Sequence, residues 1–79
     1  MSNKIKLIWD FRGPDAAKIA EHHEFHLKEF IQIEKITLNI TGFTVLNEVY
    51  AIAYMVVEKS EMIPVRDALK PHRGEIYTE

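Results

Sequence analysis

The chain contains no cysteine, which removes several classes of chemistry at once. Thiol nucleophiles, disulfide bridges and thiolate-bound metal ions are all excluded. Small secreted domains often depend on disulfides for their stability, so the absence of cysteine favours a cytoplasmic location.

Long apolar runs are also missing. The longest covers residues 49–57, whereas a helix that crosses a bilayer needs about 20 apolar residues. Near the N-terminus the only apolar run is the short one from Leu7 to Trp9, which is too short for a signal peptide. We therefore expect neither a transmembrane helix nor a membrane partner.

Glycine and proline are scarce, with three of each, and the formal net charge is only −2. The hydrophobic share of 47% argues against disorder, which requires few apolar residues and strong net charge. The small acidic charge gives no overall attraction to nucleic acid. A length of 79 residues predicts one domain that spans residues 1–79.

The sequence does show patterns that predict a series of strands and helices. Residues 4–12 alternate with a period of two, which predicts a strand with Ile5, Leu7, Trp9 and Phe11 on its buried face. Gly13 and Pro14 end that strand, and apolar residues at helical spacing then predict a helix to about residue 34.

Shorter elements follow. Between residues 35 and 46 a strand is predicted, and the apolar parity changes at Gly42, which indicates a bulge. The remaining predicted elements are a strand that is apolar on both faces, a short helix and a last strand, over residues 49–57, 62–70 and 74–78.

This order of strand, helix, strand, strand, helix, strand resembles the ferredoxin-like split βαβ arrangement over the whole chain. The resemblance implies an α+β fold with a four-stranded antiparallel sheet and two helices on one face. It also places the first and third strands at the centre, where we expect them to run parallel to each other. It implies no function, because many unrelated activities share this fold.

Three of the four histidines lie close together on the long helix. His22 and His26 are four residues apart and project from one helical face, so they could share a divalent metal ion such as Zn²⁺, Ni²⁺ or Cu²⁺. Glu29, one turn further, could add an oxygen ligand. The alternative is a solvated helix face, because buried structural and catalytic zinc sites use three or four protein ligands. No other cofactor is evident.

His23 falls inside the apolar stripe of the helix. It is either a half-buried structural histidine with one hydrogen bond, or a proton donor or acceptor in a pocket between helix and sheet. Asp10, near the end of the first strand, is the second candidate for catalysis. No nucleophile, base and acid stand in a recognisable pattern, so the sequence leaves open whether the protein is an enzyme.

A basic turn joins the short helix to the last strand. Arg66, His72 and Arg73 form a candidate site for a small phosphate or carboxylate ligand. The alternative is a solvated loop whose cations complement the end of the short helix.

The third strand carries alanines on one face and tyrosines on the other. Small alanines suit close helix packing, so we expect Tyr50 and Tyr54 on the open face of the sheet together with Ile8. An exposed apolar patch is normally covered, and the commonest cover is a second copy of the chain. RNA is a less favoured partner for this face, because the aromatic RNP1 motif is missing and the net charge is acidic.

The sequence thus predicts a small cytoplasmic binding or interaction module of unknown ligand that forms a homodimer through its sheet. The alternative is a small enzyme or metal-binding protein that uses the helix histidines and the basic C-terminal turn.

Overall fold

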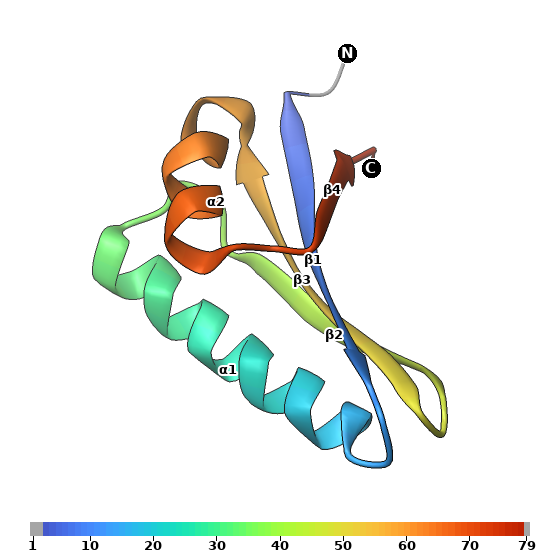
Figure 1. Ribbon diagram of the computed structural model, residues 1–79. Helices are drawn as coiled ribbons and strands as arrows, with labels where there is room; N and C mark the ends of the chain where they lie inside the picture. The colour runs from blue at the N-terminus through green and yellow to red at the C-terminus, as the bar shows by residue number, and fades with distance from the viewer. Residues whose placement is uncertain (1–2, 79) are drawn as a thin grey trace.

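A computed structural model describes residues 3–78 as a four-stranded sheet with two α-helices (Figure 1). A 3₁₀ turn, Lys59–Glu61, precedes the second helix. The elements in chain order are β1 (Lys4–Arg12), α1 (Ala16–Glu34), β2 (Ile40–Asn47), β3 (Tyr50–Glu58), α2 (Met62–Leu69) and β4 (Arg73–Ile76). Within the described range no helix is both long and apolar enough to span a membrane.

The strands are ordered β2-β3-β1-β4, and each neighbouring pair is antiparallel. The predicted antiparallel sheet and the central positions of β1 and β3 are therefore confirmed. The prediction that these two central strands run parallel is wrong. Helix α1 returns the chain so that β2 runs in the direction of β1, and the tight turn after β2 then reverses β3.

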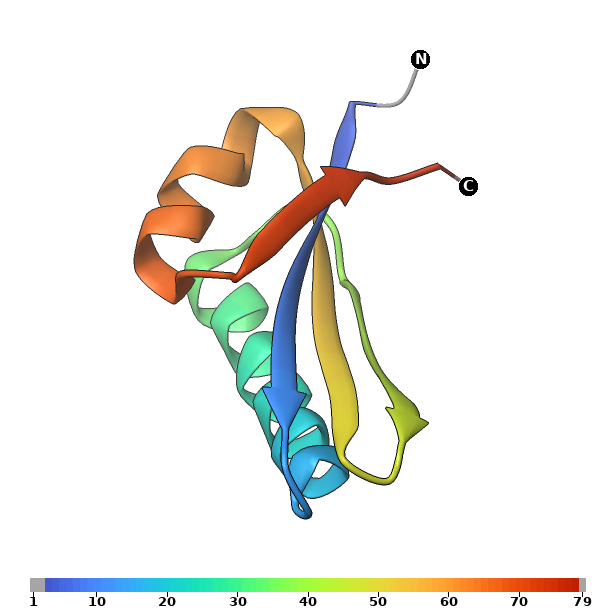
Figure 2. The same cartoon turned by 45° about the vertical axis from the view of Figure 1, so that its right-hand side comes forward.

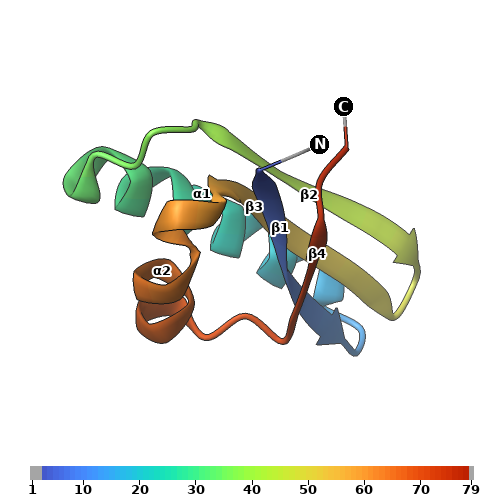
Figure 3. The same cartoon turned by 90° about the horizontal axis from the view of Figure 1, so that it is seen from above.

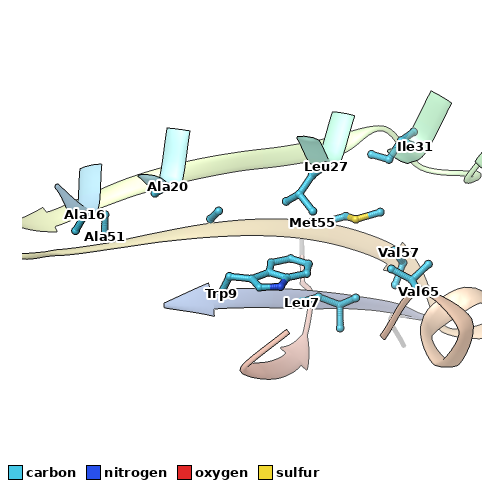
Figure 4. Close-up of a cluster of buried hydrophobic side chains, with 11 residues drawn as sticks. Leu7, Trp9, Ala16, Ala20, Leu27, Ile31, Ala51, Met55, Val57 and Val65 are labelled. Carbon is cyan, nitrogen blue, oxygen red and sulfur yellow. The ribbon is translucent and has the colours of Figure 1, made fainter. Parts of the chain in front are cut away.

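Both helices lie on one face of the sheet (Figures 1 and 2). Side chains from β1, β3, α1 and α2 form the core between the two layers, and Figure 4 shows Leu27 of α1 beside Met55 of β3. The alternation predicted for β1 is confirmed, because Leu7 and Trp9 belong to this core. The core residues are Leu7, Trp9, Ala16, Ala20, Leu27, Ile31, Ala51, Ala53, Met55, Val57 and Val65.

The second strand differs from its prediction. It begins at Ile40 rather than at residue 35, because Lys35 ends α1 in the left-handed conformation, with φ 54°. The predicted bulge at Gly42 is wrong, since Gly42 pairs regularly with Tyr54 and the register shift lies between Val45 and Asn47. A Cβ at Gly42 would overlap the Tyr54 ring, so this glycine leaves room for the ring to lie across the sheet.

Candidate functional site

A groove of about 430 Å³ lies between α2 and β4, on the face of the sheet that carries the helices. Helix α1 has 19 residues and packs along the sheet, whereas α2 has only eight. Figure 2 shows α2 beside β4, and Figure 3 shows the connecting segment, residues 70–72, running from α2 across to β4. The groove is therefore the part of the sheet face that the short second helix leaves uncovered.

The floor and walls of the groove are mostly apolar. Ile5 and Leu7 of β1 line it together with Met62 of α2 and Ile76 of β4. Ile76 is 69% exposed, which is unusual for a large aliphatic side chain on the packed face of a sheet. When a ligand covers apolar surface that was in contact with water, the free energy of the complex is lowered.

Gly74 keeps the groove open at its centre. It pairs with Leu7, so a side chain at this position would project into the groove. A Cβ built there lies 3.5 Å from Leu7 Cδ2 and 3.7 Å from Ile5 Cγ2, which is ordinary van der Waals contact. A larger residue at position 74 would thus fill the groove without a clash at its Cβ.

Arg66 supplies a positive charge at the groove. Its side chain is 51% exposed, and its Nε and Nη2 atoms lie 3.4 Å from Oδ1 of the neighbouring Asp67. These distances are at the long end for hydrogen bonds, and Asp67 is itself exposed, so the ion pair is weak. The Arg66 guanidinium therefore remains accessible at the groove.

The other two residues of the predicted ligand-binding set, His72 and Arg73, also line the groove, but their polar groups bond elsewhere. The Arg73 guanidinium forms a bidentate contact with the Asp10 carboxylate, with Nε 3.1 Å from Oδ2 and Nη2 3.1 Å from Oδ1. The Nδ1 atom of His72 accepts the backbone N–H of Asp10 at 2.8 Å. The structure thus brings all three predicted residues to one groove, and among them Arg66 has the guanidinium that is not held by Asp10.

Asp10 links β1, β3 and β4 on the open face of the sheet. Besides Arg73, its carboxylate accepts the hydroxyl of Tyr50. The hydrogen bonds from Arg73 and then Tyr50 lower the pKa of the Asp10 carboxyl, against the opposing effect of burial. The same contact raises the pKa of Arg73. Asp10 therefore stays ionised and holds β4, one wall of the groove, against the sheet.

His23 and Asp10, the two candidates for catalysis, are not brought together. The His23 ring packs against Trp9 and Phe11, with ring centroids 4.9 and 5.3 Å away, on the helix-bearing face. Asp10 lies on the opposite face of β1, because successive residues of a strand alternate. Burial lowers the pKa of His23, and the nearby charges of His26, His72 and His22 act in the same direction. Its buried Nε2 has no hydrogen-bond partner among residues 3–78, so the predicted hydrogen bond is not seen.

The histidine pair on α1 has converging rings. The Nε2 atoms of His22 and His26 are 2.9 Å apart, and His26 Nδ1 lies 3.1 Å from Glu29 Oε1. Glu29 thus lies on the far side of the His26 ring from the two converging nitrogens. In the described part of the chain, no group of three or more His, Asp or Glu side chains is arranged to hold a metal ion.

The open face carries Tyr50 and Tyr54, and the predicted face of β3 is confirmed because Ala51 and Ala53 lie in the core. Ile8 also belongs to this face but is only 2% exposed, although no helix covers it. Two cation–π contacts lie on the same face. Lys6 Nζ lies 4.4 Å from the centre of the Tyr54 ring, and Arg12 lies 4.1 Å from that of Tyr50. Self-association through this face stays a prediction, but its apolar part is already covered within one chain.

A second groove of about 390 Å³ lies on the other side of α2, against the end of α1. Glu34 and Glu61 line it together with apolar residues, whereas Arg66, Arg73 and Glu75 are the charged residues that line the groove beside β4.

Sequence reasoning missed the apolar lining of the groove. The alternation of residues 4–12 places Ile5 and Leu7 on the buried face of a strand, and no sequence pattern marks Gly74 or Met62 as groove residues. The sequence does contain one indication that part of the sheet face stays uncovered. The second predicted helix has nine residues and cannot cover as much of the sheet as the first, which has about twenty.

Scans against protein-family models, curated proteins and solved structures each found no match to this chain.

Proposed function

We propose that the protein is a binding module that takes a small organic anion with an apolar body, such as a medium-chain carboxylate, in the groove between α2 and β4. The observation that carries the proposal is the combination of an apolar floor with one accessible cation, Arg66. Ligand sites in proteins typically combine a largely apolar lining with a few polar groups that fix orientation.

The groove has a suitable size and chemistry for such a ligand. Its volume of about 430 Å³ falls within the range of small-molecule sites. The guanidinium of Arg66 offers paired N–H donors that match the two oxygens of a carboxylate. Leu7, Met62 and Ile76 would bury the apolar body of the ligand.

We also propose that the fold is ferredoxin-like. The element order and the sheet order β2-β3-β1-β4 support this assignment. A fold of this kind hosts unrelated functions, so the fold alone does not identify the ligand. The predicted cytoplasmic location stays a prediction.

Calorimetric titration with octanoate and with its neutral counterpart octanamide tests the binding proposal. We expect octanoate to bind the wild-type protein more tightly, and Arg66→Gln to weaken octanoate by roughly 10–100-fold, since a hydrogen bond to a charged group contributes about 1.5–3 kcal/mol. The matched control is Arg12→Gln, on the open face, which should bind octanoate like the wild type. Equal binding of the two ligands, or equal loss in both variants, would contradict the proposal.

The predicted homodimer has its own test. Light scattering over a hundredfold range of concentration measures the mass in solution. A dimer that becomes a monomer in Tyr54→Ala would support the open face as the interface, whereas a monomer at every concentration would contradict the prediction.

A further inference from the structure

We infer that His22 and His26 form an exchangeable, two-ligand site for Cu²⁺, Ni²⁺ or Zn²⁺ on the solvent face of α1, with Glu29 as a positioning residue. This site is independent of the proposed groove. It rests on the convergence of two imidazole nitrogens and on the carboxylate behind one of them.

The distance between the nitrogens suits a chelate. His22 Nε2 and His26 Nε2 are 2.9 Å apart. Two imidazole nitrogens that each lie about 2.0–2.1 Å from one metal ion are separated by roughly 2.9–3.4 Å at octahedral or tetrahedral angles. The helix therefore already holds the two rings close to the separation that a shared ion requires.

Glu29 fixes the orientation of one ligand. A carboxylate 3.1 Å from His26 Nδ1 accepts the N–H of that nitrogen and leaves the lone pair on Nε2. Histidines that bind metal in proteins usually donate their other ring N–H to such a group. Glu29 acts through His26 in this arrangement and is not itself a ligand, in contrast to the role expected from its spacing.

His22 needs one change to bind. With the lone pair of His26 on Nε2, His22 donates its own Nε2–H across the 2.9 Å contact. His22 binds the metal ion through Nε2 in its other neutral tautomer, in which the single ring proton lies on Nδ1 and the Nε2 lone pair faces the ion.

The site leaves its other coordination positions to water. The side chains of His26 and Glu29 are 56% and 52% exposed, and no third protein ligand completes the site within residues 3–78. Two ligands make a weaker site than the three or four of resident zinc, which is why the ion exchanges. The order of affinity for divalent ions should place Cu²⁺ above Ni²⁺ and Zn²⁺.

Calorimetric titration of the untagged chain with Ni²⁺, at neutral pH in a non-chelating buffer, tests the inference. We expect one ion per chain, loss of binding in His26→Ala, and a roughly tenfold weaker affinity in Glu29→Gln, as for other residues that orient a metal ligand. Glu34→Gln, an exposed glutamate on the same helix, is the matched control and should bind like the wild type.

A spacing control separates chelation from the mere presence of histidines. The double variant His26→Ala with Lys28→His keeps four histidines but places the second ring away from His22. We expect it to lose Ni²⁺ binding while its circular dichroism stays that of the wild type. Wild-type affinity in this variant, or in His26→Ala, would overturn the inference, as would equal effects of Glu29→Gln and Glu34→Gln.

Discussion

Replacing Asp10 with Asn should weaken the attachment of β4 to the sheet. The Asp10 carboxylate accepts hydrogen bonds from Arg73 of β4 and Tyr50 of β3. The backbone N–H of Asp10 donates to Nδ1 of His72. Asn keeps the shape and an acceptor oxygen but removes the charge. The variant therefore isolates the electrostatic part of the contact.

The strength of these hydrogen bonds sets the expected loss in the free energy of unfolding. A hydrogen bond to a charged group contributes about 1.5–3 kcal/mol, against about 0.5–1.5 kcal/mol for a neutral one. The Asp10 side chain is only 19% exposed, so its bond to Tyr50 is partly shielded from water. We expect Asp10→Asn to lower the free energy of unfolding by about 1–2 kcal/mol at neutral pH, and the melting temperature by roughly 5–15 °C.

The effect should depend on pH in one direction. The folded-state pKa of Asp10 lies below its ordinary value, mainly because of the hydrogen bond from Arg73. A lowered pKa contributes stability that is fully present above the unfolded pKa of about 3.9 and is lost as the pH falls through the folded value. The difference in the free energy of unfolding between wild type and Asp10→Asn should thus be complete at pH 6–7 and shrink as the pH falls below about 3.9.

Trp9 provides the assay. It is the only tryptophan, is 3% exposed, and donates its Nε1–H to Leu69 O at 3.0 Å, so its fluorescence reports unfolding in urea. Amide hydrogen exchange at His72 and Tyr77, which donate to β1, reports the release of β4 directly. A difference below about 0.5 kcal/mol at pH 7, or one that persists unchanged at pH 2, would refute the role of Asp10.

Two further predictions concern backbone conformation and packing. Lys70 ends α2 in the left-handed conformation, with φ 50°, so Lys70→Gly should raise the free energy of unfolding by about 0.5–1 kcal/mol; an unchanged or lower urea midpoint would contradict this. Gly42→Ala should lower it by about 1–3 kcal/mol, because the added Cβ overlaps the Tyr54 ring. Most of that loss should disappear when Gly42→Ala is measured against a Tyr54→Ala background, and an equal loss in both backgrounds would show that the ring is not the cause.

Local periodicity predicted most of the architecture. The alternation of residues 4–12 gave the bounds of β1, because a strand with one packed face requires that pattern. The start of β2 could not be predicted from apolar alternation. Ile36, Leu38 and Ile40 alternate like a strand, but the left-handed residue that ends α1 is Lys35, and lysine gives no sequence signal for that conformation.

The candidate site was predictable only in part. A cluster of cations near residues 66–73 pointed to the region where the groove lies, but the pairing of Arg73 with Asp10 joins residues 63 positions apart and depends on the sheet register. The separation of His23 from Asp10 was readable, because Asp10 falls on the face of β1 opposite Trp9 and Phe11. The groove itself arises from the short length of α2 and from Gly74, which no local pattern connects.

The most direct test of the binding proposal is a two-dimensional amide NMR titration of the wild type and of Gly74→Leu with octanoate. We predict saturable shifts that cluster at Leu7, Met62, Gly74 and Ile76 in the wild type. In Gly74→Leu, which fills the groove, these shifts should vanish while the rest of the spectrum stays that of the folded protein. Shifts located elsewhere, or the same titration in both proteins, would contradict the proposal that this groove is the binding site.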